Sequence, residues 1–275
     1  MKYLKKLVIH FFLNLEHIVF YKKFESFLKK SSAHNRDKLL KLHRDAFEDL
    51  KEFVKKYFSL KNFNDQFYFD LTLKTQTVDK GQKLSFIHGY LLQEELRKYL
   101  LFNKSETNIN ILEIGTARGY SSICMAKVLN EQNMNGKIIT VDILPVDKKI
   151  YWNSISDIES GKQTRYELLK PWEHLVNKYI IYIKGYTKIA LTKIFLPRIN
   201  FCFIDGSHEY DDVKYEIQFV SSRQKQNDII FFDDYNKKKF PGVVQAIDKN
   251  LGIDQYEFNL LDYGEDRKYL LAIKK

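Results

Sequence analysis

The segment Ile111-Leu112-Glu113-Ile114-Gly115-Thr116-Ala117-Arg118-Gly119-Tyr120-Ser121 decides the fold class of this chain. Its apolar start predicts a buried strand, its glycines predict a tight turn, and the residues that follow predict a helix. In an open α/β sheet, ligands bind outside the carboxyl ends of the strands. The segment therefore predicts an α/β sheet together with a ligand-binding loop.

The residue types in this loop suit an amino-acid head group. Gly115 lets the backbone turn tightly and approach a ligand closely. Ser121 and the first amides of the helix can hold a carboxylate, because helix N-termini attract anions. Glu113, at the end of the strand, can pair with an ammonium group. A zwitterionic ligand would thus find partners of both signs.

A second acidic residue ends the next apolar segment, Lys137-Ile138-Ile139-Thr140-Val141-Asp142. A carboxylate at this place can accept both hydroxyls of a ribose. A nicotinamide dinucleotide site or an ordinary α/β turn would use similar residues. However, the glycines at 115 and 119 do not form G-x-G-x-x-G, and Asp142 lies further along than that fingerprint requires. We therefore favour a methionine-derived nucleoside cofactor.

The Glu-Ile-Gly-…-Gly-Tyr-Ser form of the loop resembles motif I of class I S-adenosylmethionine-dependent methyltransferases, and it is similar to that of catechol O-methyltransferases. The resemblance implies S-adenosylmethionine binding by Glu113, Gly115, Ser121 and Asp142. We also expect contacts from Thr116, and from Tyr186 after the third strand. Many relatives have an acidic residue after that strand, where this chain has Gly185-Tyr186-Thr187.

Two further apolar segments end in acidic residues: Phe201-Cys202-Phe203-Ile204-Asp205 and Ile229-Ile230-Phe231-Phe232-Asp233-Asp234. If the two strands are neighbours, three carboxylates meet at one edge of the sheet, and they repel unless a cation lies among them. Mg²⁺ prefers such oxygen ligands. His208 follows closely and can act as a general base. The alternative is that the carboxylates cap helices and His208 is an ordinary loop residue.

The run Asp205-Gly206-Ser207-His208-Glu209-Tyr210-Asp211-Asp212 resembles methyltransferase family 24, which includes macrolide-sugar O-methyltransferases of the macrocin and mycinamicin type. Catechol O-methyltransferases have a lysine at the position of His208. The likeness covers roughly residues 80–275. It implies metal-assisted O-methylation, with Asp205, Asp233 and Asp234 on the metal, His208 as the base, and a sugar, glycan or natural-product hydroxyl as the acceptor.

The remaining pattern predicts a doubly wound α/β fold with seven mostly parallel strands, a Rossmann-like methyltransferase fold behind an N-terminal helical extension. We expect the extension at residues 1–78 and the methyltransferase domain at 79–275. The expected strands are 109–114, 138–142, 179–184, 200–204, 228–232, 255–260 and 268–273. The expected helices are 3–28, 37–58, 82–101, 119–132, 165–177, 187–196, 210–225 and 241–250.

The net charge of +10 lies mainly in the N-terminal part, where residues 1–108 carry 21 Lys and Arg against 13 Asp and Glu. An amphipathic helix with flanking lysines can lie on an anionic membrane surface, pack internally or form a homo-oligomer. We therefore expect peripheral membrane contact or oligomerisation through residues 1–30. Cys124 and Cys202 lie in apolar runs and predict buried thiols. Together with the lack of a membrane span or cleavage site, they favour a cytoplasmic location, with contact at the inner membrane surface as one option.

Three alternatives compete with this interpretation. The first is a metal-independent methyltransferase of the same fold that acts on another small molecule. The second is a nucleic-acid methyltransferase, which the basic charge suggests, but the chain lacks the Asn/Asp-Pro-Pro-aromatic motif after the fourth strand, so we expect no nucleic-acid partner. The third is a scaffold that works through its basic helix, which the cofactor loop and the acidic cluster argue against.

Overall fold

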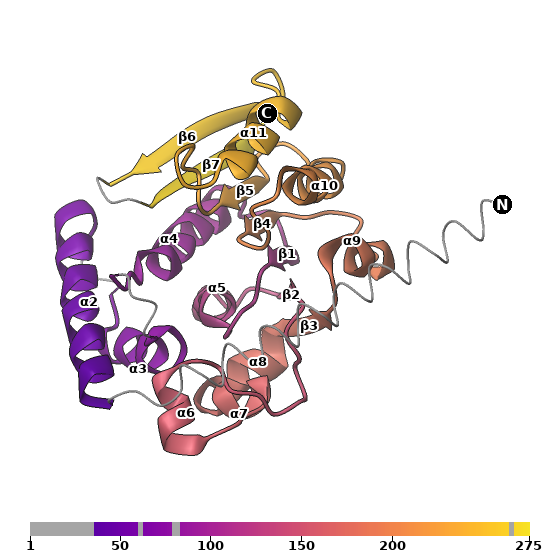
Figure 1. Ribbon diagram of the computed structural model, residues 1–275. Helices are drawn as coiled ribbons and strands as arrows, with labels where there is room; N and C mark the ends of the chain where they lie inside the picture. Colours follow the sequence, from indigo (N-terminus) through magenta and orange to yellow (C-terminus); the bar gives the residue numbers. More distant parts are fainter. Residues whose placement is uncertain (1–35, 60–62, 79–82, 264–266) are drawn as a thin grey trace. The chain divides into compact units, whose positions relative to one another are not determined.

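A computed structural model describes residues 36–59, 63–78, 83–263 and 267–275 (Figure 1). These residues form two compact units. The first comprises the described residues up to Ile87, with Arg118–Tyr120 and Ile143–Pro171; the second comprises the rest. The helix expected at 3–28 lies outside the described residues. The domain boundary after residue 78 stays a prediction.

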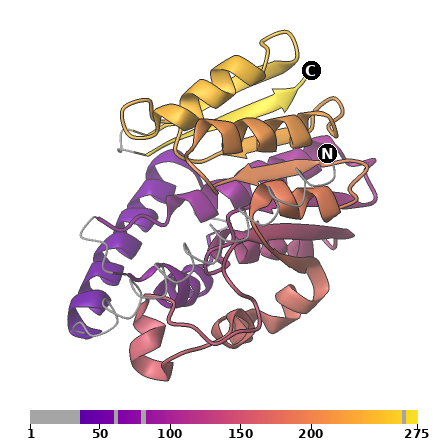
Figure 2. The same ribbon diagram turned by 45° about the vertical axis from the view of Figure 1, so that its right-hand side comes forward.

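The second unit contains a seven-stranded sheet in the order β3-β2-β1-β4-β5-β7-β6 (Figure 2). Its strands are β1 Ile109–Ile114, β2 Gly136–Asp142, β3 Ile180–Lys184, β4 Phe201–Ile204, β5 Ile229–Phe232, β6 Tyr256–Asp262 and β7 Lys268–Lys274. The pairs within β3-β2-β1-β4-β5 are parallel, whereas β7 pairs antiparallel with both β5 and β6. The predicted doubly wound, mostly parallel sheet with a terminal hairpin is confirmed.

Helices lie on both faces of this sheet (Figures 1 and 2). They are α4 Ile87–Phe102, α5 Tyr120–Glu131, α8 Glu173–Tyr179, α9 Thr187–Ala190, α10 Tyr210–Ser221 and α11 Pro241–Asn250. Cys202 and Ile204 of β4 belong to the core that α9, α10 and α11 share. Phe201 alternates to the other face and makes an edge contact with Tyr99 of α4. Continuous burial of β4 and β5 agrees with strands covered on both sides.

Two expected helices contain 3₁₀ turns, and a proline limits each of them. The helix expected at 165–177 is divided into α7 Arg165–Leu168, a 3₁₀ turn at Lys170–Trp172 and α8. Pro171 cannot donate the backbone hydrogen bond that a continuous helix needs. The helix expected at 187–196 is α9 followed by a 3₁₀ turn at Leu191–Lys193. Pro197 disfavours helical geometry at Leu196, so a helix could not have continued to residue 196.

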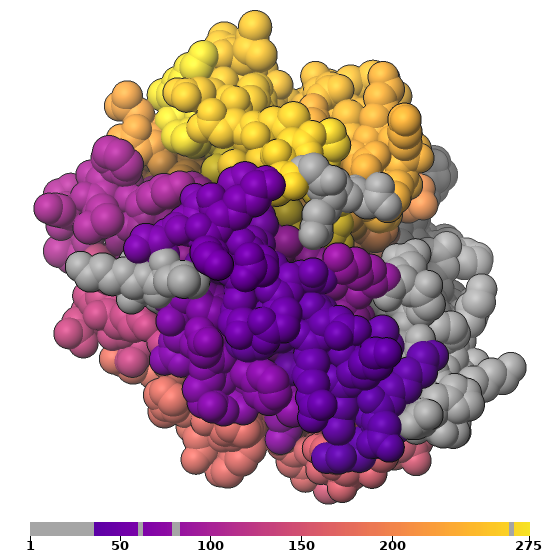
Figure 3. Space-filling view, turned by 90° about the vertical axis from the view of Figure 1, so that its left-hand side faces the viewer, coloured from indigo at the N-terminus to yellow at the C-terminus, as the bar shows by residue number. Residues whose placement is uncertain are grey.

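The first unit is helical, with α2 Arg36–Tyr57, α3 Asp65–Gln76, α6 Ile155–Ser160 and α7. Helix α2 confirms the prediction at 37–58, whereas α3 and α6 were not predicted. One side of α2 is buried and includes His43. The other side, indigo in Figure 3, carries exposed charges such as Lys41, Arg44 and Glu48. In the described part of the chain, no helix is long and apolar enough to cross a membrane.

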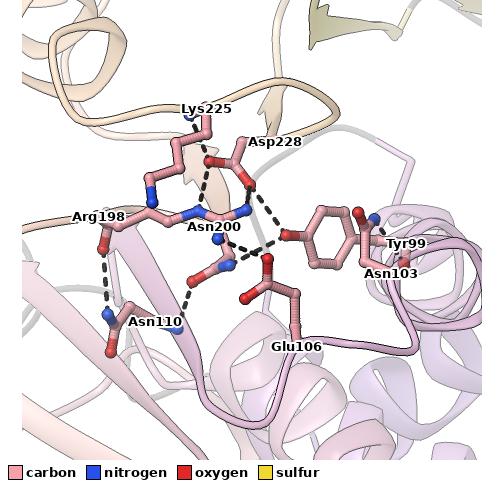
Figure 4. A network of polar contacts seen from close by, with 8 residues as sticks. All are labelled: Tyr99, Asn103, Glu106, Asn110, Arg198, Asn200, Lys225 and Asp228. Atoms are coloured by element: carbon pink, nitrogen blue, oxygen red, sulfur yellow. Dashed lines mark hydrogen bonds and ion pairs between the residues drawn. The ribbon is translucent and has the colours of Figure 1, made fainter.

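A polar network closes the amino-terminal edge of the sheet in the second unit (Figure 4). Asp228, just before β5, is fully buried and accepts hydrogen bonds from Nε of Arg198 at 3.0 Å and from the Tyr99 hydroxyl at 2.9 Å. Arg198 also contacts Glu106, before β1, at 2.6 Å. The network connects α4 to the starts of β1, β4 and β5. The carboxyl ends of the same strands lie at the opposite edge of the sheet.

Candidate active site

The strand register places the predicted acidic residues at one edge of the sheet. Ile114 of β1 pairs with Ile204 of β4, and Ile204 pairs with Phe232 of β5. The next residues along β4 and β5 are Asp205 and Asp233, and both continue the ladder. The amide of Asp205 donates to the Ile114 carbonyl at 2.8 Å, and the amide of Asp233 donates to the Ile204 carbonyl at 3.1 Å. The parallel pairing therefore brings the two acidic segments together, as predicted.

Gly115 joins the cofactor loop to this acidic edge. It has φ of +96°, and a Cβ at this position would lie 2.0 Å from the backbone oxygen of Asp205. Only glycine allows both the left-handed backbone and so close an approach. The first residue of the predicted cofactor loop thus packs directly against the first predicted metal ligand.

Glu113 is fully buried beneath the loop. Its Oε2 accepts hydrogen bonds from the hydroxyls of Ser122 and Thr140, the latter at 2.5 Å, while its Oε1 has no hydrogen-bond partner among the described residues. Removal from water raises the pKa of Glu113. A buried acceptor without a donor is costly. An ammonium group that reached Oε1 would supply the donor, which fits the amino-acid end of S-adenosylmethionine.

Asp142 ends β2 and shapes the cofactor loop. Its Oδ2 accepts a hydrogen bond from the amide of Ala117 at 2.6 Å, and Ala117 has a left-handed φ of 44°. The hydroxyl of Thr116 is buried and hydrogen bonds with that of Thr140 at 2.5 Å. Asp142 is partly exposed, as a ribose contact requires. The loop and the strand end that were predicted separately therefore form one local structure.

The other two predicted cofactor residues lie on different elements. Ser121 is buried in the first turn of α5. Tyr186 precedes α9, and its hydroxyl donates to Oδ1 of Asp212 at 2.6 Å. Their contacts with a cofactor stay predictions.

Asp205, Asp234 and His208 could hold a metal ion, because their ligand atoms all lie within 4.8 Å of one another. Nε2 of His208 lies 2.8 Å from Oδ2 of Asp234. Asp234 has a left-handed φ of 58°, which turns the chain sharply after β5. Two carboxylates beside an imidazole are a donor set that divalent cations accept.

Asp233 has other partners. Its Oδ1 accepts the amide of Asp234 at 2.6 Å, and its Oδ2 lies 3.9 Å from Nη1 of Arg267. Arg267, which precedes β7, was not anticipated from the sequence. The structure groups His208, rather than Asp233, with Asp205 and Asp234. Direct metal ligation by Asp233 stays a prediction.

The electrostatics of the edge favour a bound cation. Removal from water and the neighbouring Asp233 and Asp234 raise the pKa of Asp205 well above its usual range. Removal from water also raises the pKa of Asp233, against the opposing charge of Arg267. Carboxylates this close repel one another, and a divalent cation between them would reduce that repulsion.

His208 stands at the accessible side of the cluster, with 47% of its side chain exposed. The Asp234 hydrogen bond raises the pKa of His208, so the ring is a better proton acceptor than an isolated imidazole. Phe240 packs on the ring at 4.5 Å between centroids. A Cβ on Gly242 of α11 would lie 2.4 Å from the His208 carbonyl. Neither Phe240 nor Gly242 had been singled out, because their only signal is proximity in space.

Comparison with known proteins agrees with this geometry. A family profile described as "Methyltransferase domain", that of methyltransferase family 24, matches residues 112–235. This range contains every predicted site residue. The chain is a class I S-adenosylmethionine-dependent methyltransferase of the family 24 type. A second profile, for protein-L-isoaspartate (D-aspartate) O-methyltransferase, matches residues 30–170 of this methyltransferase and ends before the acidic edge. No curated protein sequence matches.

Solved structures resemble the methyltransferase over most of its length. A putative O-methyltransferase from Klebsiella pneumoniae has a TM-score of 0.56 at 15% identity, covering 85% of this chain and 99% of its own. The O-methyltransferase TomG from Streptomyces achromogenes, solved with S-adenosylmethionine, has a TM-score of 0.55 at 16% identity, with coverage of 85% and 99%. A TDP-rhamnose 3′-O-methyltransferase of calicheamicin biosynthesis has a TM-score of 0.50 at 16% identity, with coverage of 82% and 93%. At these identities the likeness concerns the fold.

Proposed function

We propose that this methyltransferase is a metal-assisted O-methyltransferase. The observation that carries the proposal is the packing of Gly115 against the Asp205 carbonyl, because it brings the cofactor loop to the edge that holds Asp205, Asp234 and His208. S-adenosylmethionine at that loop would present its methyl group beside the acidic edge. The arrangement suits transfer of this methyl group to a hydroxyl oxygen.

The chain's own residues have distinct parts in this chemistry. Glu113 holds the ammonium end of the cofactor, and Asp142 holds its ribose. Asp205 and Asp234 would hold the cation, with Asp233 beside them, and a bound cation would lower the pKa of an acceptor hydroxyl. His208 receives the hydroxyl proton on Nδ1, because its Nε2 donates to Oδ2 of Asp234. Asp234 orients the ring through the hydrogen bond at 2.8 Å.

The acceptor that we favour is a hydroxyl of a sugar, a glycan or a related natural product. The Asp205–Asp212 run, with histidine in place of the lysine of catechol O-methyltransferases, supports a sugar hydroxyl over a phenol. The structural neighbour that methylates TDP-rhamnose at its 3′ position is consistent with this choice. The sequence Asp205-Gly206-Ser207-His208, in place of an Asn/Asp-Pro-Pro-aromatic motif after the fourth strand, argues against nucleic acid as the acceptor.

A screen of acceptors with labelled S-adenosylmethionine tests the proposal, with Mg²⁺ or Mn²⁺ and with chelator. We expect methyl transfer to a hydroxyl that stops in chelator and returns with the cation. His208→Ala should lower turnover by roughly 10²–10⁴-fold, as expected for a general base. The matched control is His174→Ala, since His174 lies exposed on α8.

Three results would separate the parts of the proposal. Full activity in excess chelator would favour the metal-independent alternative of the same fold. A fully active His208→Ala enzyme would remove the base assignment alone. Binding of Mn²⁺ to the protein can be measured without an acceptor, and it should be lost in Asp205→Ala and Asp234→Ala.

A further inference from the structure

Asp212 of α10 makes three side-chain contacts from an almost buried position. Its Oδ1 accepts the Tyr186 hydroxyl at 2.6 Å and lies 2.7 Å from Nζ of Lys188. Its Oδ2 accepts the Ser207 hydroxyl at 2.8 Å. The two oxygens of one carboxylate therefore bind two different segments of the chain.

Both segments contain residues of the proposed site. Ser207 lies between Asp205 and His208, so the contact with Oδ2 holds the loop that carries the cation and base residues. Tyr186 directly precedes α9 and Lys188 lies within it, next to the place where the cofactor's nucleoside end is expected. Helices α9 and α10 lie side by side (Figures 1 and 2). Asp212 therefore connects the Asp205–His208 loop to the Tyr186–Lys188 segment.

The charge of Asp212 is maintained in spite of its burial. Removal from water raises the pKa of this carboxyl, but hydrogen bonds from Lys188, Tyr186 and Ser207 outweigh that effect and leave the pKa below its usual range. Glu216, one turn further along α10, shows the opposite result. Burial, with the nearby charge of Asp212, raises the pKa of Glu216 to about 8. Of these two buried carboxyl groups, Asp212 is therefore the one that carries the negative charge.

An acidic residue in the first turn of a helix commonly stabilises the helix through its dipole. Asp211 is also an aspartate, lies in the same turn and is exposed. Asp212 differs because both of its oxygens bind side chains from outside α10. A role in the helix alone would not require those contacts, and this difference makes Asp211 a matched control.

We propose that Asp212 is a positioning residue, which holds the Asp205–His208 loop at the spacing from the Tyr186–Lys188 segment that methyl transfer needs. This inference rests on the proposed function for its kinetic consequence. The structural link between the two segments does not rest on the proposed function, because it can be measured in the absence of any acceptor.

Amide hydrogen exchange tests the link directly. Asp212→Ala should increase exchange in residues 205–209 and 186–190 at least about 10-fold, because local opening becomes easier when a buried contact is lost. Asp211→Ala should leave both segments unchanged. Ser207→Ala should affect the first segment only, and Tyr186→Phe the second only. Unchanged exchange in Asp212→Ala would overturn the inference, whether or not an acceptor has been found.

Kinetics then test the consequence. Asp212→Ala should lower kcat by roughly 10–100-fold, since a displacement of about 1 Å can cost this much. Asp212→Asn, which keeps the shape and loses the charge, should recover part of the loss. The double variant Asp212→Ala/Ser207→Ala should be no slower than the worse single variant. Losses that multiply, or a fall in thermal stability without a fall in kcat, would contradict positioning through Ser207. An inactive wild type with intact exchange differences would instead contradict the proposed function.

Discussion

Asp228→Asn should destabilise the protein strongly without changing its cofactor site. Asp228 is fully buried and accepts four hydrogen bonds, from Nε and Nη2 of Arg198 and from Tyr99 and the Lys225 amide (Figure 4). Its charge raises the pKa of Arg198. An asparagine keeps the shape, but its amide group would turn a donor toward one of these donors. It would also leave the Arg198 charge half-buried and poorly compensated.

The magnitude follows from this arrangement. Removing one partner from a buried ion pair costs about 3–5 kcal/mol, because the other charge loses its compensation in a place that water reaches poorly. At about 2–4 °C per kcal/mol for a protein near this size, the thermal midpoint should fall by about 6–20 °C. The control is Glu106→Gln, which weakens a more exposed contact of Arg198 and should cost less than about 1 kcal/mol.

Urea titrations followed by circular dichroism would measure both variants, and calorimetry at 25 °C would measure their affinity for S-adenosylmethionine. The network lies at the amino-terminal edge of the sheet, and the candidate site lies at the carboxyl-terminal edge. Affinity should therefore stay within about 2-fold of wild type while the variant is folded. A loss of less than about 1 kcal/mol in Asp228→Asn, or a loss equal to that of Glu106→Gln, would refute this account of the network.

Four further outcomes are expected. Asp142→Ala should lower S-adenosylmethionine affinity by more than 10-fold in calorimetry, because a good polar contact with a buried ligand group contributes at least about 1.4 kcal/mol; Asp147→Ala, an exposed neighbour, should not. Glu216 has a pKa of about 8 in the folded protein, above its unfolded value, so the stability that its neutral form contributes is complete at low pH and is lost as the pH rises toward 8. In Glu216→Gln the free energy of unfolding should therefore depend less on pH over this range, by at most about 5 kcal/mol. Burial lowers the pKa of His43 to about 4, so its contribution is complete above pH 6.5 and is lost as the pH falls toward 4, and His43→Gln should unfold with a weaker dependence on acid; an unchanged acid transition would contradict it. Removal of residues 1–30 should leave cofactor affinity intact and abolish either binding to anionic liposomes or self-association in sedimentation; loss of neither would contradict a role in association.

The centre of the sheet could be predicted because β4 and β5 are buried on both faces. Such strands are continuous apolar runs, and β4 and β5 each end abruptly at an aspartate. The helical first unit was harder to predict. Helix α3 has apolar and polar residues on all sides, so its periodicity is weak, and α6 has only six residues. Their positions depend on tertiary contacts, such as the Ile155 amide donating to the Thr77 carbonyl at 3.0 Å.

The candidate site was predictable to the extent that parallel pairing determines it. Asp205 and Asp233 follow residues of paired strands, so sequence position alone places them together. Arg267 and Asp212 could not be found in this way. Arg267 reaches the edge from the antiparallel hairpin, and Asp212 from the first turn of α10, where acidic residues are common for reasons of helix stability.

Arg267 changes how the acidic edge should be understood. Three carboxylates suggested three metal ligands, yet Asp233 has a nearby cation in the protein itself, at 3.9 Å. Repulsion still remains, because Asp233 and Asp234 both raise the pKa of Asp205, and His208 lies against Asp234. Oδ2 of Asp234 accepts a hydrogen bond from Nε2 of His208, so a cation between Asp205 and Asp234 would share this carboxylate with the imidazole. The two oxygens of Asp234 allow it to bind the cation and to orient the base at the same time.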